Sequence, residues 1–201
     1  MDIRISNARI SFANGLWNAS AAVEGGIPKY NCDFIVTPDS KVERKTAEGK
    51  WVSTSLKEAQ RLVAEEAFKG DAKKASAWFE DLDARQKSVR VGDKNKDKAG
   101  DVRQGYEGNL YVHATSKTLM PVYRGDKSIV AREEDSPIYS GCYVNMQVEL
   151  WAQENTNGKG LRATLLGIQK VRDGDAFGGG SAPNADDFGE VTEGADAADL
   201  T

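Results

Sequence analysis

Cysteine and histidine, the residues that most often build zinc and redox sites, are nearly absent from this sequence. Its 201 residues include two cysteines, Cys32 and Cys142, and one histidine, His113. The cysteines are far apart, each lies within an apolar, strand-like run, and neither belongs to a CxxC motif. We therefore expect two buried, reduced thiols, no zinc or other metal site, and no cofactor.

Long hydrophobic runs are also missing. No stretch approaches the roughly 18 apolar residues that a membrane helix needs. The N-terminus, MDIRISNARI, lacks the basic-then-apolar order of a signal peptide. Both absences favour a soluble intracellular protein without a membrane partner.

Basic residues are missing from the end of the chain. The sequence has 27 Lys and Arg against 31 Asp and Glu, and all 27 basic residues lie at or before Arg172. Residues 1–172 therefore carry a formal charge of +4, whereas eight acids give residues 173–201 a charge of −8. This asymmetry favours a nucleic acid or another polyanion as the partner of the body, with a solvated interaction segment at the end.

Apolar and polar residues alternate over several short stretches, which predicts strands. DIRISNARISF changes the parity of its alternation, so a β-bulge is expected near Asn7. YNCDFIV is a second strand, and the polar residues 39–52 form a hairpin arm or a loop. Later strands are predicted for KSVRV, NLYVHATS, LMPVYR, CYVNMQVELWA and LRATLLGIQKV, with a turn at Asn157-Gly158 between the last two.

A helical periodicity separates the early strands from the later ones. Ser55 and Glu58 form a capping-box pattern before a helix that runs to Gly70, and Asp71 caps a second helix. Apolar residues spaced for one face of that helix should meet the core: Ala75, Trp78, Phe79 and Leu82. The sequence thus predicts a single domain, a small antiparallel barrel or sandwich with a helical insertion at about 54–84.

Two predicted strands carry aromatic rings on the face that points away from the core. Tyr143 and Trp151 lie at the two ends of such a face in GCYVNMQVELWA, and Tyr111 shares one with His113 and Thr115 in NLYVHATS. Rings of this kind suit a single-strand binder, because stacking on a base contributes roughly 1–3 kcal/mol without sequence preference. The alternative is that they form cross-strand pairs or lie beneath the helical insertion.

A cationic, Gly-rich segment, KSVRVGDKNKDKAGDVRQGYEG, leads into the second of these strands. We interpret it as a flexible flap whose mobile charges neutralise phosphates. Within it Asp93, Asn95 and Asp97 imitate an EF-hand loop, but Lys98 and Gln104 occupy the positions that require Gly and Glu. A calcium site is therefore not expected.

Common catalytic motifs are missing as well: GxSxG, a Walker loop and a Cys/His pair do not occur. A non-enzymatic nucleic-acid binder is the favoured hypothesis. The alternatives are a metal-dependent nuclease or other DNA-processing enzyme built from scattered Asp and Glu, and a structural or adaptor protein whose aromatics form a protein interface.

Several stretches together resemble the phage-encoded single-stranded DNA-binding proteins that have an OB-type barrel. They are GYEGNLYVHATS, LMPVYR, YSGCYVNMQVELWA, GKGLRATLLGIQKVRDGDAFGGG and the acidic tail, with a weaker match at ISNARISFANGLW. The resemblance implies a mainly β, OB-like, antiparallel and partly open β-barrel, here residues 1–172, followed by a Gly-rich linker and a disordered acidic tail, 173–201. Two departures are that the helical pair falls earlier than the helix of the standard topology, and that Phe188 lies well before the chain's end.

The resemblance also implies a function. The protein would coat single-stranded DNA in the host bacterial cytoplasm during phage DNA replication and recombination, and the acidic tail would compete with DNA and recruit replication or recombination proteins. Homo-oligomer formation is left open. The predicted DNA-binding residues are Lys87, Arg90, Lys94, Lys96, Lys98, Arg103, Tyr106, Tyr111, Tyr143 and Trp151, with Tyr123, Arg124 and Arg162 at the rim.

Overall fold

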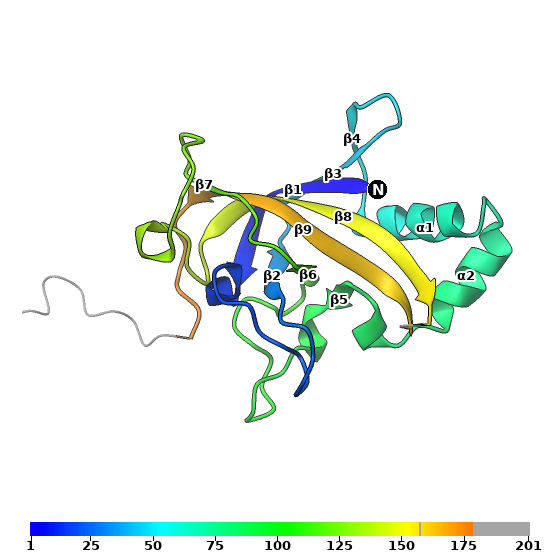
Figure 1. Ribbon diagram of the computed structural model, residues 1–201, viewed down its shortest axis with the longest axis horizontal. Helices are drawn as coiled ribbons and strands as arrows, with labels where there is room; N and C mark the ends of the chain where they lie inside the picture. The colour runs from blue at the N-terminus through cyan, green and yellow to red at the C-terminus, as the bar shows by residue number, and fades with distance from the viewer. Residues whose placement is uncertain (157, 179–201) are drawn as a thin grey trace, which may run out of the picture.

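The computed structural model describes residues 1–156 and 158–178, and in this part the chain is mainly β-structure. Asn157 of the predicted turn, Phe188 and the acidic tail after Gly178 lie outside the described residues. The elements follow in this order: β1 (Asp2–Ser11), β2 (Tyr30–Val36), β3 (Lys41–Lys45), β4 (Trp51–Ser53), α1 (Leu56–Ala67), α2 (Ala72–Glu80), β5 (Val89–Val91), β6 (Leu110–Ser116), β7 (Val122–Tyr123), β8 (Tyr143–Asn155) and β9 (Gly158–Arg172) (Figure 1).

Five strands pair in a ring, in the order β1, β2, β6, β9, β8 and back to β1. Two joints of the ring are weak, because β1 and β2 share three residue pairs and β6 meets β9 only at Thr115 and Thr164. The predicted mainly β domain with a helical insertion is confirmed, and the ring does not close into a regular barrel. The expectation of a purely antiparallel sheet is wrong, since β9 runs parallel to both β6 and β7.

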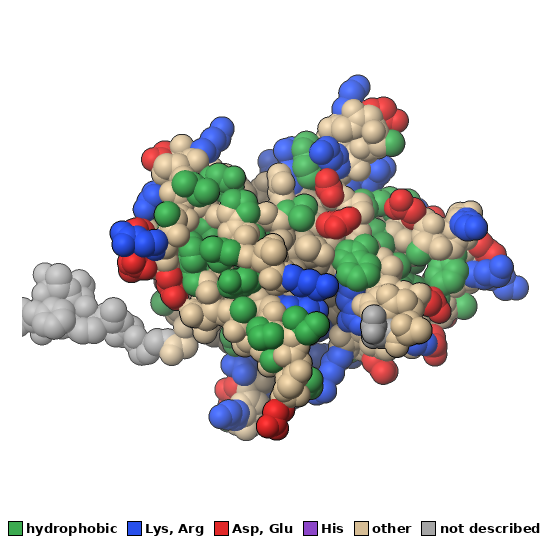
Figure 2. Space-filling model, in the orientation of Figure 1, with side chains coloured by type: hydrophobic (Ala, Val, Ile, Leu, Met, Phe, Trp, Pro, Cys, Tyr) green, Lys and Arg blue, Asp and Glu red, His purple; other side chains and the backbone are tan. Residues whose placement is uncertain are grey.

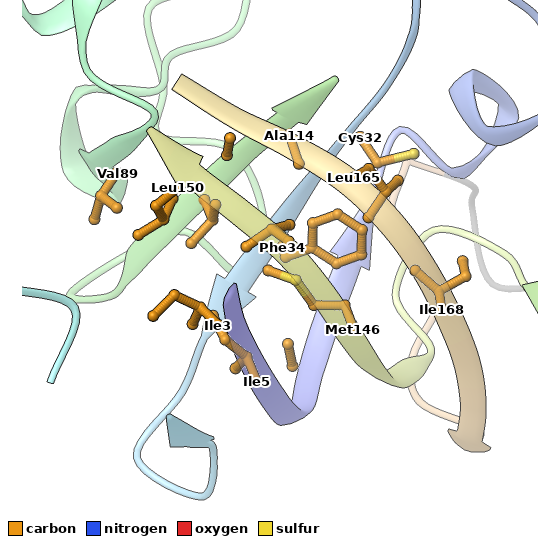
Figure 3. Close-up of a cluster of buried hydrophobic side chains, with 14 of the residues drawn as sticks. Ile3, Ile5, Cys32, Phe34, Val89, Ala114, Met146, Leu150, Leu165 and Ile168 are labelled. Atoms are coloured by element: carbon orange, nitrogen blue, oxygen red, sulfur yellow. The ribbon is translucent and has the colours of Figure 1, made fainter. Parts of the chain in front are cut away.

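The inner surface of the ring holds the main hydrophobic core. Figure 3 shows side chains from β1, β2, β6, β8 and β9 meeting there, among them Ile5, Phe34 and Met146. In β8 all of the residues predicted to face inward are buried: Cys142, which precedes it, then Val144, Met146, Val148 and Leu150. Strict alternation along β8 was therefore enough to assign its inner face.

Both cysteines are free and buried in this core, as predicted. Burial raises the pKa of Cys32 well above the ordinary value, with the neighbouring charge of Asp33 as a smaller cause. It also raises the pKa of Cys142. Thiolate, the reactive form, is therefore disfavoured at both positions.

The bulge in β1 lies where the parity of the sequence changes. The register with β8 shifts between Ile5 and Ala8, and Asn7 adopts a left-handed backbone with φ of 57°. Asn145 of β8 fixes this bend, because its Oδ1 accepts a hydrogen bond from Asn7 N at 3.1 Å. Asn tolerates this backbone better than most residues.

The helical insertion follows the β3–β4 hairpin and lies at one end of the ring, where α1 contacts β8 (Figure 1). Ser55 and Asp71 cap the two helices, accepting hydrogen bonds from Glu58 N and Lys74 N. The first helix ends at Ala67, three residues before the predicted Gly70. Of the predicted apolar face, Ala75, Trp78 and Leu82 are buried and Phe79 is partly buried. Among the described residues, no helix is long and apolar enough to cross a membrane.

The first residues after β9 pack back onto the ring. Arg9 Nη2 donates to Asp175 O at 2.7 Å, and Phe177 N donates to Ser140 O at 2.9 Å. The Phe177 ring lies against the buried pair Tyr106 and Tyr111. The division of the chain at residue 172 stays a prediction, since most of the second segment lies outside the described residues.

Candidate nucleic-acid interface

The outer surface of the ring carries a row of small polar side chains that crosses three strands. Asn31 of β2 pairs with Thr115 of β6, and Thr115 pairs with Thr164 of β9. Each of these residues alternates with core residues on its own strand, so its side chain points outward. All three residues are partly exposed, so the row offers polar groups to solvent or to a ligand.

A second row beside it is basic and aromatic. Ser88, which precedes β5, accepts a hydrogen bond from His113 N and donates its own N–H to Leu161 O, so it joins β6 to β9. This junction brings Arg90 of β5 beside Arg162 of β9. Trp151 of β8 pairs with Arg162 and is 38% exposed, and its Nε1 donates to Thr164 Oγ1 at 3.0 Å.

We call the two rows together the outer strip. Its members are Asn31, Arg90, His113, Thr115, Trp151, Arg162 and Thr164. Figure 2 shows basic side chains near the middle of the face on which β9 lies in Figure 1.

The two guanidiniums of the outer strip repel each other. Burial lowers the pKa of Arg162, and the charge of Arg90 lowers it further. Their hydrogen bonds go to neutral acceptors, Arg162 Nε to Gln153 Oε1 at 2.9 Å and Arg90 Nε to Lys87 O at 2.7 Å. Within the described part of the chain, neither forms an ion pair with a carboxylate. Two fixed like charges without a counter-ion favour an anionic ligand.

Tyr106 and Tyr111, which the sequence places on the interface, are buried in the structure, with exposures of 1% and 6%. They meet edge to face, with ring centroids 5.0 Å apart, in a second small core with Ile35 on the outer side of β2 and β6. The segment 92–109 forms the cover of this core. A base cannot stack on either ring without displacing that segment.

Asp33 of β2 is a buried polar residue that binds this cover. Its Oδ2 accepts a 2.7 Å hydrogen bond from the Tyr106 hydroxyl, and its Oδ1 lies 2.7 Å from His113 Nδ1. Asn95 Nδ2 lies 3.5 Å from the same carboxylate. Burial raises the pKa of Tyr106, and the charge of Asp33 raises it further, so the phenol stays protonated and donates.

The segment predicted as a flexible flap forms an excursion, residues 92–109, with several internal hydrogen bonds. Gly92 N donates to Asn109 O at 2.8 Å, Asp93 Oδ1 accepts from Gly108 N at 2.7 Å, and Lys96 pairs with Val102. Gly92 also lets the two ends of the excursion touch, because a Cβ there would lie 2.0 Å from Tyr106 O. Three predicted cations on it are exposed: Lys94, Lys96 and Lys98.

The other predicted residues lie outside the outer strip or make contacts within the protein. The Tyr143 ring lies under the guanidinium of Arg172, whose Cζ is 3.3 Å from the ring centroid. Arg124 of the loop after β7 donates to backbone oxygens of that loop and of Asp135. Tyr123 lines a separate groove of about 690 Å³ on the outer side of β1, β8 and β9. Figure 2 shows hydrophobic side chains gathered over β7.

The structure therefore brings together Arg90, Trp151 and Arg162 from the predicted set. Lys87 lies beside them, since it forms a bridge with Leu161, and its Nζ lies over the Phe79 ring. Sequence reasoning did not identify Asn31 and Thr164. Their positions between core residues of β2 and β9 were the available signal.

The five-stranded ring thus carries a polar outer surface with an exposed ring at Trp151 and two guanidiniums beside it. The model of the family described as Enterobacter phage Enc34, ssDNA-binding protein, matches residues 1–200, and the chain belongs to this family. A protein named p50, from Acyrthosiphon pisum secondary endosymbiont phage 1, is 29% identical over 96% of this chain and 95% of its own length.

Solved structures agree with the fold. The single-stranded DNA-binding protein from bacteriophage Enc34 in complex with ssDNA matches with a TM-score of 0.58 and 21% identity, over 88% of this chain and 89% of that one. A second structure of the Enc34 protein matches with a TM-score of 0.56 and 19% identity, over 92% of this chain and 88% of that one.

We predict that Tyr106→Phe destabilises the protein by about 1–3 kcal/mol, because Asp33 stays buried and loses one hydrogen-bond donor. Urea denaturation would measure the free energy of unfolding. Tyr123→Phe is the matched control, since Tyr123 is exposed. Equal stability of the two variants would contradict the role of the hydroxyl.

Proposed function

We propose that the protein is a non-enzymatic, largely sequence-independent single-stranded DNA-binding protein, and that the strand lies across the outer strip. The observation that carries the proposal is the pair Arg90 and Arg162, two guanidiniums without a carboxylate partner among the described residues, beside the exposed ring of Trp151. Membership of the Enc34 family supports it. So does the structure of the Enc34 protein with ssDNA, as the fold is shared.

The outer strip suits a single strand for two physical reasons. Guanidiniums attract phosphates of any sequence, and the release of counterions from the DNA drives binding. A ring stacks on any base, since every base has a π-face. The small polar side chains between them leave room for a backbone to pass.

The other predicted cations contribute to the positive potential around the outer strip in this proposal. Lys94, Lys96 and Lys98 are exposed on the excursion 92–109 and raise the local potential around the strip. Lys87 lies next to the strip through its bridge with Leu161, and Arg103 belongs to the excursion. Tyr123 and Arg124 lie outside the outer strip, and the Tyr143 ring packs against Arg172. Tyr106 and Tyr111 are buried in the second small core beside the strip.

The biological role follows from the same proposal. The protein would coat exposed single strands in the host cytoplasm during phage DNA replication and recombination. Its acidic tail would compete with DNA for the basic surface and recruit replication or recombination proteins. Incubation of labelled single strands with magnesium tests the non-enzymatic part, and cleavage would favour the nuclease alternative instead.

We expect two variants to separate the phosphate and base contributions. Replacing Arg90 and Arg162 together with Gln should weaken binding and reduce the slope of log K against log salt, by roughly 0.7 for each phosphate that the variant no longer neutralises. Trp151→Ala should weaken binding by about 1–3 kcal/mol and leave the slope unchanged. Fluorescence titrations with a labelled oligonucleotide at several salt concentrations measure both.

Arg124→Gln serves as the control for the guanidinium variant, because Arg124 lies in the loop after β7 and donates only to backbone oxygens there. Its salt slope should equal that of the parent protein. If the slope of the Arg90 and Arg162 double variant is unchanged, the outer strip is not part of the DNA-binding surface.

Deletion of residues 179–201 should tighten DNA binding, most strongly at low salt where charges are screened least. The segment carries six acids and no base. The cut after Gly178 keeps the packed residues 173–178, so the ring itself is unchanged. Equal affinity of the truncated and full chains at low salt would show that the tail does not compete with DNA.

A further inference from the structure

Phe12 occupies a backbone conformation that its side chain does not favour. It follows β1 with φ of 57° and ψ of 42°, which is the left-handed region, and its side chain is 41% exposed. A bulky residue in this region is strained, whereas Gly and Asn adopt it at little cost. The turn needs the backbone shape, because Gly15 N donates to Phe12 O at 2.9 Å as the chain enters the short helix Ala13–Leu16. Neither the turn nor core packing explains why the residue is Phe.

The position of Phe12 is set by the strands beside it. Ser11 pairs with Asp33 of β2, and Asp33 pairs with His113 of the outer strip. The short helix after Phe12 lies directly on β2, since a Cβ on Gly15 would be 1.9 Å from Asn31 O. Phe12 therefore lies at the β2 end of the outer strip, whereas Trp151 lies at the β8 end.

A guanidinium covers the Phe12 ring. Arg103 Cζ lies 5.4 Å from the ring centroid. The backbone of Arg103 is fixed nearby, because its N–H donates to Asn95 O at 3.0 Å and Asn95 in turn contacts Asp33. Within the described residues Arg103 forms no ion pair with a carboxylate. A ring beside a free guanidinium provides a stacking face for a base and a charge for a phosphate.

We propose that Phe12 and Arg103 form a second contact site for single-stranded DNA, in which Phe12 stacks on a base. One bound strand would then cross β8, β9, β6 and β2, from Trp151 at one end to Phe12 at the other. This inference rests on the proposed function. It adds a binding residue on the loop after β1. It also implies a minimum length of DNA strand that can reach both Trp151 and Phe12.

The test compares oligonucleotides of increasing length on the full chain, from about 3 to about 16 nucleotides, the range covered by OB-type sites. Phe12→Asn removes the ring and suits the left-handed backbone, and Phe12→Tyr keeps the ring. Phe12→Asn should weaken binding of the long oligonucleotides by about fivefold to a hundredfold, which corresponds to one stacked base. It should leave the shortest oligonucleotides that still bind unaffected, and Phe12→Tyr should match the parent.

Denaturation checks that the weaker binding is not a folding defect. Phe12→Asn should be at least as stable as the parent protein, because the strain at this position is relieved. Arg103→Gln provides a second variant that leaves the Phe12 backbone untouched. It should weaken the binding of long oligonucleotides only, and lower the slope of log K against log salt by roughly 0.7.

Three results would overturn the inference in different ways. Parent-like affinity of Phe12→Asn at every length would remove the second site and leave the proposed function intact. An equal decrease in affinity at every length would place the ring beside Trp151 rather than at the far end. Failure of the parent protein itself to bind single strands would overturn the proposed function.

Discussion

The outer surface of this protein depends on how one buried carboxylate is paired. Asp33 points away from the barrel core, yet it is buried, and it is held by Tyr106, His113 and Asn95. A buried carboxylate without such partners would cost several kcal/mol. The pairing fastens the excursion 92–109 onto β2 and β6, which seals the rings of Tyr106 and Tyr111. It also fixes the position of the His113 imidazole, which belongs to the outer strip.

The excursion divides the outer surface into a covered part and a wet part. The covered part is a second small core with Ile35, and the wet part is the outer strip. The strip gathers cations from strands that meet only through tertiary pairing, β5 and β9, and it ends in exposed rings at Trp151 and Phe12. Binding without sequence preference requires little more than this, because phosphates and base faces are common to every strand. The groove beside Tyr123 is a different surface, where hydrophobic side chains gather over β7.

Periodicity predicted which side chains point into the core, because the alternation of apolar and polar residues within one strand is enough to identify its inner face. Val144, Met146 and Val148 are buried as expected, and the bulge at Asn7 lies where the alternation changes parity. The same reasoning failed for Tyr111, because alternation identifies two faces and does not say whether a distant segment covers the second one. An acid inside the apolar strand YNCDFIV was the sign that something polar closes over it. The sequence could not predict that Arg90 lies beside Arg162. Ser88 joins their strands by backbone hydrogen bonds that no local pattern encodes.

The central claim is that single-stranded DNA lies across the outer strip. The most direct measurement is photo-cross-linking of a strand carrying 5-iododeoxyuridine at successive positions, followed by mass spectrometry of the linked peptides. We expect links to Trp151 and His113, with links to Phe12 appearing only from positions at the other end of the strand. Links confined to Tyr123 and the groove on the outer side of β1, β8 and β9 would contradict the claim.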